Sequence, residues 1–164
     1  MEREKILDAL RTLHQHIDLE AERIAKELPL RCAVGCASCC VDDVSVFEVE
    51  AARIQAEFGD LLSSQAPHPR GRCAFLDEQE RCRIYPARPY VCRTQGLPLR
   101  WLEEKGDEVE EFRDICALNE QVDLTALEPN ACWPIGPVEE RLSLLQQLWG
   151  TKHRLPLRSL FGKK

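Results

Sequence analysis

The cysteines constrain this chain most, because nine of them occur in 164 residues and eight fall between positions 32 and 116. Cysteines that return every two to four residues let one loop wrap several sulfurs around a cation at low cost in chain entropy. The spacing therefore predicts metal binding by these thiols. The predicted ligands are Cys32, Cys36, Cys39, Cys40, Cys73, Cys82, Cys92 and Cys116.

Other uses of cysteine fit this pattern less well. Nine thiols cannot all pair, and a reducing cytosol disfavours disulfides. Cysteines that only fill a core would be scattered along the chain. Cys132 lies outside the cluster and is expected to be such a core thiol. Among the histidines, His68 is the one candidate substitute ligand, since zinc accepts mixed sets of Cys and His.

The vicinal pair Cys39 and Cys40 bears on the number of ions. Adjacent side chains point in different directions, so the pair indicates two nearby ions, a polynuclear cluster, or one ligand beside a thiol that binds no metal. Eight thiolates would complete two tetrahedral zinc sites. Four could instead hold a [4Fe–4S] cluster, with the others structural. The sequence leaves zinc or iron, and the partition of the ligands, open.

Charge and hydropathy narrow the class of protein. The net charge of −6 disfavours nucleic acid as a partner, because phosphate binding usually requires a basic balance. No stretch approaches the roughly 20 apolar residues of a membrane span. The N-terminus carries charges throughout and lacks the apolar run of an export signal. A cytoplasmic protein is therefore expected. Its macromolecular partner, if it has one, is expected to be another protein. The sequence does not predict the oligomeric state.

Apolar periodicity and turn residues predict an α+β fold with helices packed around a short β-hairpin. A helix is expected over 3–28, ended by Pro29, and a second over 46–58, with a capping box at Ser45 and Glu48 and a C-terminal cap at Gly59. The remaining predicted elements are a hairpin over 73–85, a helical turn over 86–92, a second hairpin over 97–115 and a helix over 137–149. We expect one domain over 1–164, with an amphipathic helix in 1–30, the cysteine core in 31–116 and a helical segment in 117–164.

Three blocks of the sequence resemble the YkgJ-type cysteine-cluster family. These are CAVGCASCC, EVEAARI and CAFLDEQERCRIYPARPYVCR, the last holding the pattern C-x8-C-x-I-Y-x-x-R-P-x-x-C-R. The first cysteine pair is spaced by three residues, where the family label has two. The resemblance implies a domain that chelates zinc or iron, over about half of the chain. The flagellin lysine methylase carries a similar domain, but no methyl-donor site is found in this chain.

Several functions remain open on these observations. A zinc site saturated by four thiolates has no open position, so a structural or binding module without catalysis is one prediction. An iron–sulfur protein with a redox or protein-modification role is another, and a thiol redox sensor is a third. The chain is too short for the barrel of a radical S-adenosylmethionine enzyme, and no catalytic residues are identified.

Arg88 and Arg93 beside Cys92 are expected to support the site, with an anion pocket as the alternative. Loss of the metal is expected to unfold 32–116, where large apolar residues are few.

Overall fold

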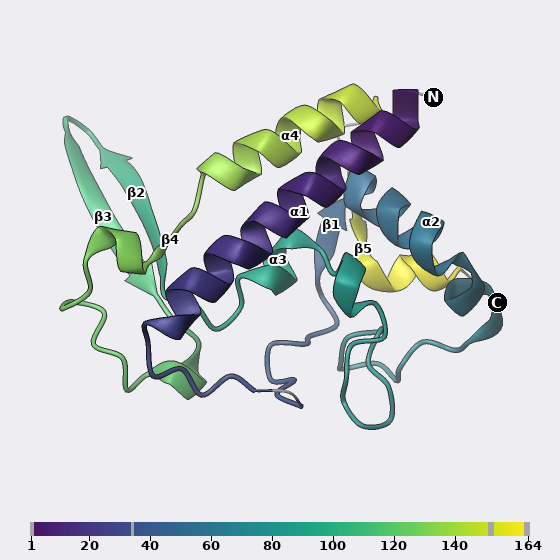
Figure 1. The fold of residues 1–164 in the computed structure, drawn as a ribbon, viewed down its shortest axis with the longest axis horizontal. Helices are drawn as coiled ribbons and strands as arrows, with labels where there is room; N and C mark the ends of the chain where they lie inside the picture. Colours follow the sequence, from purple (N-terminus) through teal and green to yellow (C-terminus); the bar gives the residue numbers. More distant parts are fainter. Residues whose placement is uncertain (1, 34, 151–152, 163–164) are drawn as a thin grey trace.

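The computed structural model describes residues 2–33, 35–150 and 153–162, and its elements are those expected of an α+β protein (Figure 1). The α-helices are α1 (Glu2–Lys26), α2 (Glu48–Ser64), α3 (Tyr90–Arg93) and α4 (Pro137–Trp149). The strands are β1 (Ser45–Phe47), β2 (Leu99–Lys105), β3 (Glu108–Asp114), β4 (Trp133–Pro134) and β5 (Arg154–Pro156). Short 3-10 helices occupy η1 (Tyr85–Ala87), η2 (Ala117–Asn119), η3 (Pro129–Ala131) and η4 (Leu157–Phe161).

Helices α1 and α4 lie side by side and run in opposite directions (Figure 1). The predicted 3.6-residue stripe of α1 is buried, with Leu10, Ile17 and Ile24 fully covered. The guanidinium of Arg3 lies 4.8 Å from the Trp149 ring centroid, which joins the start of α1 to the end of α4. In the described part of the chain, no helix has the length and apolar character needed to cross a membrane.

Helix α2 begins and ends later than its sequence predicts. Its N-cap is Phe47, whose backbone N–H donates to Glu50 Oε2 at 3.3 Å, while Ser45 belongs to β1. The predicted capping box at Ser45 is therefore wrong: Glu50 accepts the N–H of Phe47, whose side chain has no acceptor to complete a box. The helix is kinked at Phe58, the last residue of the predicted helix, and continues past Gly59 to Ser64. The part of α2 after Gly59 is stabilised because Leu62 is buried in a hydrophobic core.

Two clusters of buried side chains hold the fold together, and α2 contributes to both. Val49 packs with α1, α4 and Trp133 in the first cluster. Ala51 and Ile54 pack with Phe75 in the second, which also includes the C-terminal η4. Strands β1 and β5 pair antiparallel, from Ser45 opposite Pro156 to Phe47 opposite Arg154. This pairing brings η4, which follows β5, to α2, which follows β1.

The predicted hairpin over 97–115 is confirmed as β2 and β3, which pair from Leu99 opposite Asp114 to Lys105 opposite Glu108. Strand β4 adds in parallel to β2, and the hairpin projects from one end of the molecule instead of lying among the helices (Figure 1). Over 73–85 only an isolated bridge forms, between Leu76 and Cys82. The Cys73 N–H donates to Cys40 O at 3.0 Å instead of pairing across a hairpin, and Pro86 turns the chain into η1.

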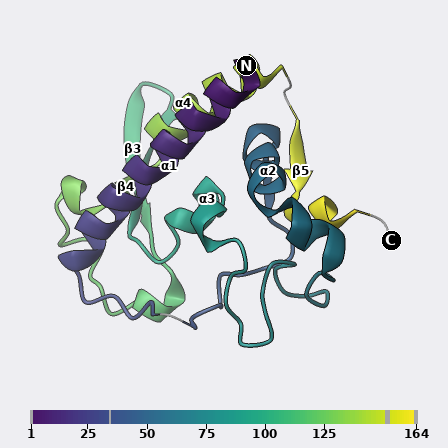
Figure 2. The ribbon, with the colours of Figure 1, turned by 45° about the vertical axis from the view of Figure 1, so that its right-hand side comes forward.

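Except for Cys92 on α3, the candidate cysteines lie on segments that run along the edge of the molecule away from α4. Figures 1 and 2 show segments 31–33, 35–44, 65–84 and 115–128 along this lower edge, below α1 and α3. Most of these segments have no regular secondary structure. Their positions therefore depend on side-chain and turn hydrogen bonds.

Candidate metal centre

The first four cysteines lie on the turns of one loop that follows α1. Cys36 N–H donates to Ala33 O and Cys40 N–H to Ala37 O, each at 3.0 Å. These tight turns return a thiol at short intervals, as the spacing predicts. Cys32 and Cys39 are exposed, while Cys36 and Cys40 are half-buried.

Cys40 and Cys73 are brought together by the backbone. Besides the bond from Cys73 N–H to Cys40 O, Arg72 Nη2 donates to Ala37 O at 3.1 Å. Arg158 of η4 fastens the same region, because it pairs with Asp42 and donates to Arg72 O at 2.8 Å. The C-terminal 3-10 helix thus holds the cysteine loop beside the segment that contains Cys73.

Cys82 and Cys92 lie near enough to Cys73 for its charge to act on both thiols. Cys82 faces Leu76 in the isolated bridge, and the next residue, Arg83, donates its N–H to Phe75 O at 2.9 Å. Burial, together with the nearby thiols of Cys73 and Cys82, raises the pKa of the Cys92 thiol to about 12. Burial likewise raises the pKa of Cys73 and of Cys82. A bound cation would offset this cost of ionisation, because metals hold thiolates deprotonated.

Asn119 joins Cys32 to Cys116 and was not found by the sequence argument. Its backbone N–H donates to Cys116 O at 2.7 Å, and its Nδ2 donates to Cys32 Sγ at 3.3 Å. The residue is fully buried; Nδ2 also donates to Gly96 O at 2.8 Å, and Oδ1 accepts from Arg31 N–H at 2.7 Å. The one signal in the sequence was its place three residues after Cys116.

The vicinal cysteines interact with each other directly. Their interaction lowers the pKa of Cys39 to about 6 and raises that of Cys40. Cys39 is exposed, whereas Cys40 is half-buried.

The candidate thiols of the described residues do not form a closed ligand shell. Among residues 2–33, 35–150 and 153–162, no three Cys, His, Asp or Glu side chains converge in the geometry of a metal site. The donor set itself fits zinc or iron, because both are held by cysteine thiolates in sets of four. His68 is half-buried and its N–H donates to Ala74 O at 2.9 Å. Cys132 is buried in the core, as predicted.

The arginines around Cys92 hold its loop against α1 and α2. Arg88 and Arg93 both donate to the carboxylate of Asp18, at 3.0 and 2.5 Å. Arg93 and Arg53 also converge on Pro86 O, at 2.9 and 3.1 Å. Because these guanidiniums are engaged by a carboxylate and a carbonyl, their contacts favour structural support over an anion pocket.

A buried histidine and glutamate extend this anchor. Glu50 is only 3% exposed, and its Oε1 accepts the Tyr90 N–H at 2.7 Å at the start of α3. Arg53 Nη1 donates to His14 Nδ1 at 2.6 Å, so Nδ1 is an acceptor and the imidazole is neutral. Its Nε2 lies 3.4 Å from Glu50 Oε1. Burial lowers the pKa of His14, and the charges of Arg93 and Arg53 add to this against the effect of Glu50.

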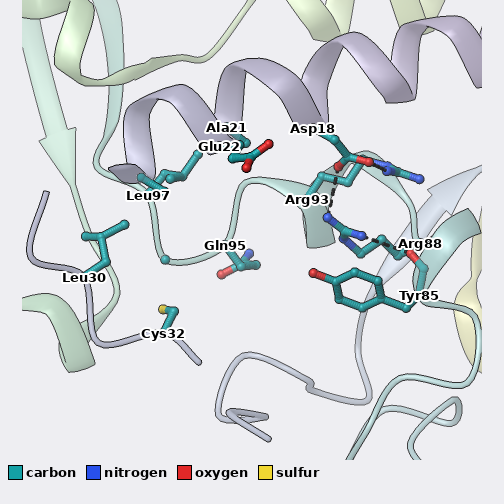
Figure 3. A pocket seen from close by; sticks show the side chains of 12 residues that line it. Asp18, Ala21, Glu22, Leu30, Cys32, Tyr85, Arg88, Arg93, Gln95 and Leu97 are labelled. Atoms are coloured by element: carbon teal, nitrogen blue, oxygen red, sulfur yellow. Dashed lines mark hydrogen bonds and ion pairs between the residues drawn. The ribbon is translucent and has the colours of Figure 1, made fainter. Parts of the chain in front are cut away.

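A hollow of about 510 Å³ separates α1 from the Cys32 loop (Figure 3). Cys32 and Leu30 lie at one end, and Tyr85 lies at the other under the Arg88 guanidinium, 3.9 Å from its ring centroid. Gln95 lies between them. The exposed Cys32 thiol is thus reached from solvent through this hollow.

The fold and the site define a class: a small helical protein with cysteine-rich loops that are fastened by arginines. The chain belongs to the CxxCxxCC family, described as a "putative zinc- or iron-chelating domain", which matches residues 31–117. This match confirms the family expected from the sequence and supports metal binding at that level. No curated protein matches the chain significantly, and neither does any solved structure.

Proposed function

We propose that this protein binds zinc or iron through its eight clustered cysteines and acts as a structural or binding module. The observation that carries the proposal is that hydrogen bonds join cysteine-bearing segments in pairs: the Cys73 N–H donates to Cys40 O, and Asn119 links Cys32 to Cys116. A buried thiol is costly to ionise unless a cation accompanies it. A metal would therefore stabilise the arrangement most where the thiols are most buried.

The metal would tie the loops to the helical part of the molecule. Phe75 and Ile84 are buried in the second core, so the segment around them has apolar support of its own. The loop 35–44 and the segment 115–123 contribute few large buried side chains. We therefore narrow the expected effect of metal loss from all of 32–116 to these two segments. The use of α2 by both cores supports a single folding unit over 1–164.

The test is elemental analysis with an absorption spectrum, on full-length protein purified without oxygen. One or two zinc ions per chain and a colourless solution would support a structural zinc module in the cytoplasm and direct the search to a partner protein. Iron with sulfide and a band near roughly 400 nm would support the iron–sulfur form. Cys132→Ser is the matched control, because this buried thiol lies outside the cluster and should not change the metal content. Absence of both metals from wild-type protein would refute the proposal.

A further inference from the structure

The tip of the β2–β3 hairpin, defined here as residues 102–111, carries most of the net charge of the chain. It holds six carboxylates and one lysine, a net charge of −5, while the other 154 residues together carry −1. The hairpin projects away from the helices, and every residue of its tip is exposed (Figure 1). The negative field of the protein therefore extends from this tip.

The charges of the tip do not stabilise the hairpin. Its base is held by β4, which pairs with the start of β2, and by the stacked rings of Trp101 and Phe112, whose centroids are 5.7 Å apart. In the tip, Glu103 lies directly opposite Glu110, and like charges in this position destabilise a sheet. Lys105, the one cation of the tip, pairs with Glu110, so Glu103 has only the neutral indole N–H of Trp101, at 2.8 Å. A charge pattern that works against local stability is typical of a functional surface.

The tip also combines two exposed apolar side chains with unpaired carboxylates. Directly opposite residues share a face of the hairpin, so Leu102 and Val109 lie diagonally on one face, and they are 56% and 64% exposed. Glu104 lies on the same face, opposite Val109. No residue that the structure describes gives the carboxylate of Glu104, Asp107 or Glu108 a hydrogen bond or an ion pair. An apolar centre with a charged rim is the usual composition of a protein-binding surface.

Other uses of the tip fit these observations less well. A hairpin that only keeps the protein soluble would mix charges of both signs and would not expose an apolar pair. A cation site requires carboxylates that converge, and in the described part of the chain no three such side chains do. Nucleic acid would be repelled by the charge of the tip.

From these features, and resting on the proposed function as a binding module, we propose that the hairpin tip docks a partner protein with a basic surface. That surface presents an apolar contact for Leu102 and Val109, surrounded by Lys and Arg side chains that pair with Glu104, Asp107 and Glu108. The carboxylates steer the partner and speed its association. The apolar pair loses contact with water in the complex and slows dissociation.

The partner is captured with the full-length chain, expressed in its source organism with a photo-crosslinking phenylalanine derivative in place of Val109. The matched control has the same derivative in place of Leu19, which is 68% exposed on α1. We expect a protein to be captured at position 109 and not at position 19, through a segment rich in Lys and Arg. Capture of a second copy alone, capture through a segment without this enrichment, or no specific capture would overturn the proposal. Metal content, measured on the same protein, tests the proposed function separately.

Binding of the purified partner separates the two contributions. It is measured at physiological salt, where exposed charges more than about 8 Å apart are largely screened. Glu104→Lys with Glu108→Lys should slow association by roughly tenfold or more. Glu78→Lys with Glu128→Lys, an equal change of charge at exposed positions elsewhere, should leave the rate nearly unchanged. Equal effects of the two pairs would overturn docking at the tip. Leu102→Ser with Val109→Ser should mainly speed dissociation, and an unchanged dissociation rate would exclude the apolar contact.

Glu103→Gln separates docking from a structural role of the charges. Glutamine keeps an acceptor for the Trp101 indole N–H but removes the like charge that faces Glu110. The melting temperature should therefore stay the same or rise, while association with the partner becomes slower. A lower melting temperature with unchanged association would show that the charge serves the fold, and would overturn its role in docking. Far-ultraviolet circular dichroism confirms that each variant is folded before its binding is measured.

Discussion

Gly96 offers a sharp test of how closely the Cys32 thiol is held. The residue has φ +88°, and a Cβ added there would lie 2.4 Å from Cys32 Sγ. Gly150, the C-terminal cap of α4, has φ +93°, and no described atom lies within 4 Å of the corresponding Cβ position. Alanine at either site meets the same backbone strain, but only at Gly96 does it also meet a sulfur.

The magnitudes follow from these two contacts. Left-handed backbone costs a non-glycine residue about 1–2 kcal/mol, which is the whole expected effect of Gly150→Ala. Carbon–sulfur contact is normally at least about 3.5 Å, so Gly96→Ala must displace the sulfur by roughly 1 Å. That movement also weakens the bond from Asn119, which is expected to contribute about 0.5–1.5 kcal/mol. We therefore expect Gly96→Ala to lose about 1.5–3.5 kcal/mol of unfolding free energy.

Urea denaturation of the metal-loaded variants measures the free energy of unfolding, and competition with a chelator measures metal affinity. Gly96→Ala should lower that affinity by about 10–100-fold, the usual effect of disturbing a group that positions a ligand. Gly150→Ala should leave metal affinity unchanged. Equal stabilities of the two variants, together with metal affinity at the wild-type value in both, would refute the close packing of Gly96 on Cys32.

Three further predictions concern the buried polar groups and the core. Asn119→Ala leaves buried hydrogen-bond partners unsatisfied, each at a cost of about 1–3 kcal/mol, so the melting temperature should fall and metal binding should weaken. Asn130→Ala, at an exposed position, should change neither quantity. As the pH falls below about 6.5, the unfolded state gains a proton that native His14 resists, so stability should fall by up to about 1.4 kcal/mol per pH unit. His14→Gln should remove this component of the urea-measured pH dependence, and Gln at the exposed His16 should retain it; no difference would contradict a neutral buried His14. Ile54→Ala should cost about 2–5 kcal/mol in urea while metal content, measured on folded protein, stays at the wild-type value.

The helices show how far local patterns carry. The predicted stripe of α1 and both ends of α4, from Pro137 to the cap at Gly150, are confirmed because periodicity and caps act within one element. The same reasoning misplaced both ends of α2, since Glu50 caps the helix at the N–H of Phe47 and Leu62 is buried by a distant segment. A helix end that depends on tertiary packing is only weakly predicted by the local sequence.

The candidate site divides in a similar way. Cysteine type and spacing were enough to predict thiolate chemistry and the family, because ligand identity belongs to the residues themselves. They could not predict that Glu50 is buried against Tyr90, or that Asn119 bonds to a sulfur 87 positions away in the chain. Such contacts are long-range, and no local pattern encodes them.

The sequence by itself therefore determined the kind of donor, its abundance and the helices that support it. Only the tertiary structure decided which thiols are neighbours, which are buried and which arginines fasten their loops to α1 and α2. The physical reason is that the cysteine segments have little regular structure of their own. Their positions are set by hydrogen bonds and ion pairs to distant elements, such as Arg93 to Asp18 and Arg158 to Asp42, and these exist only once the chain has folded.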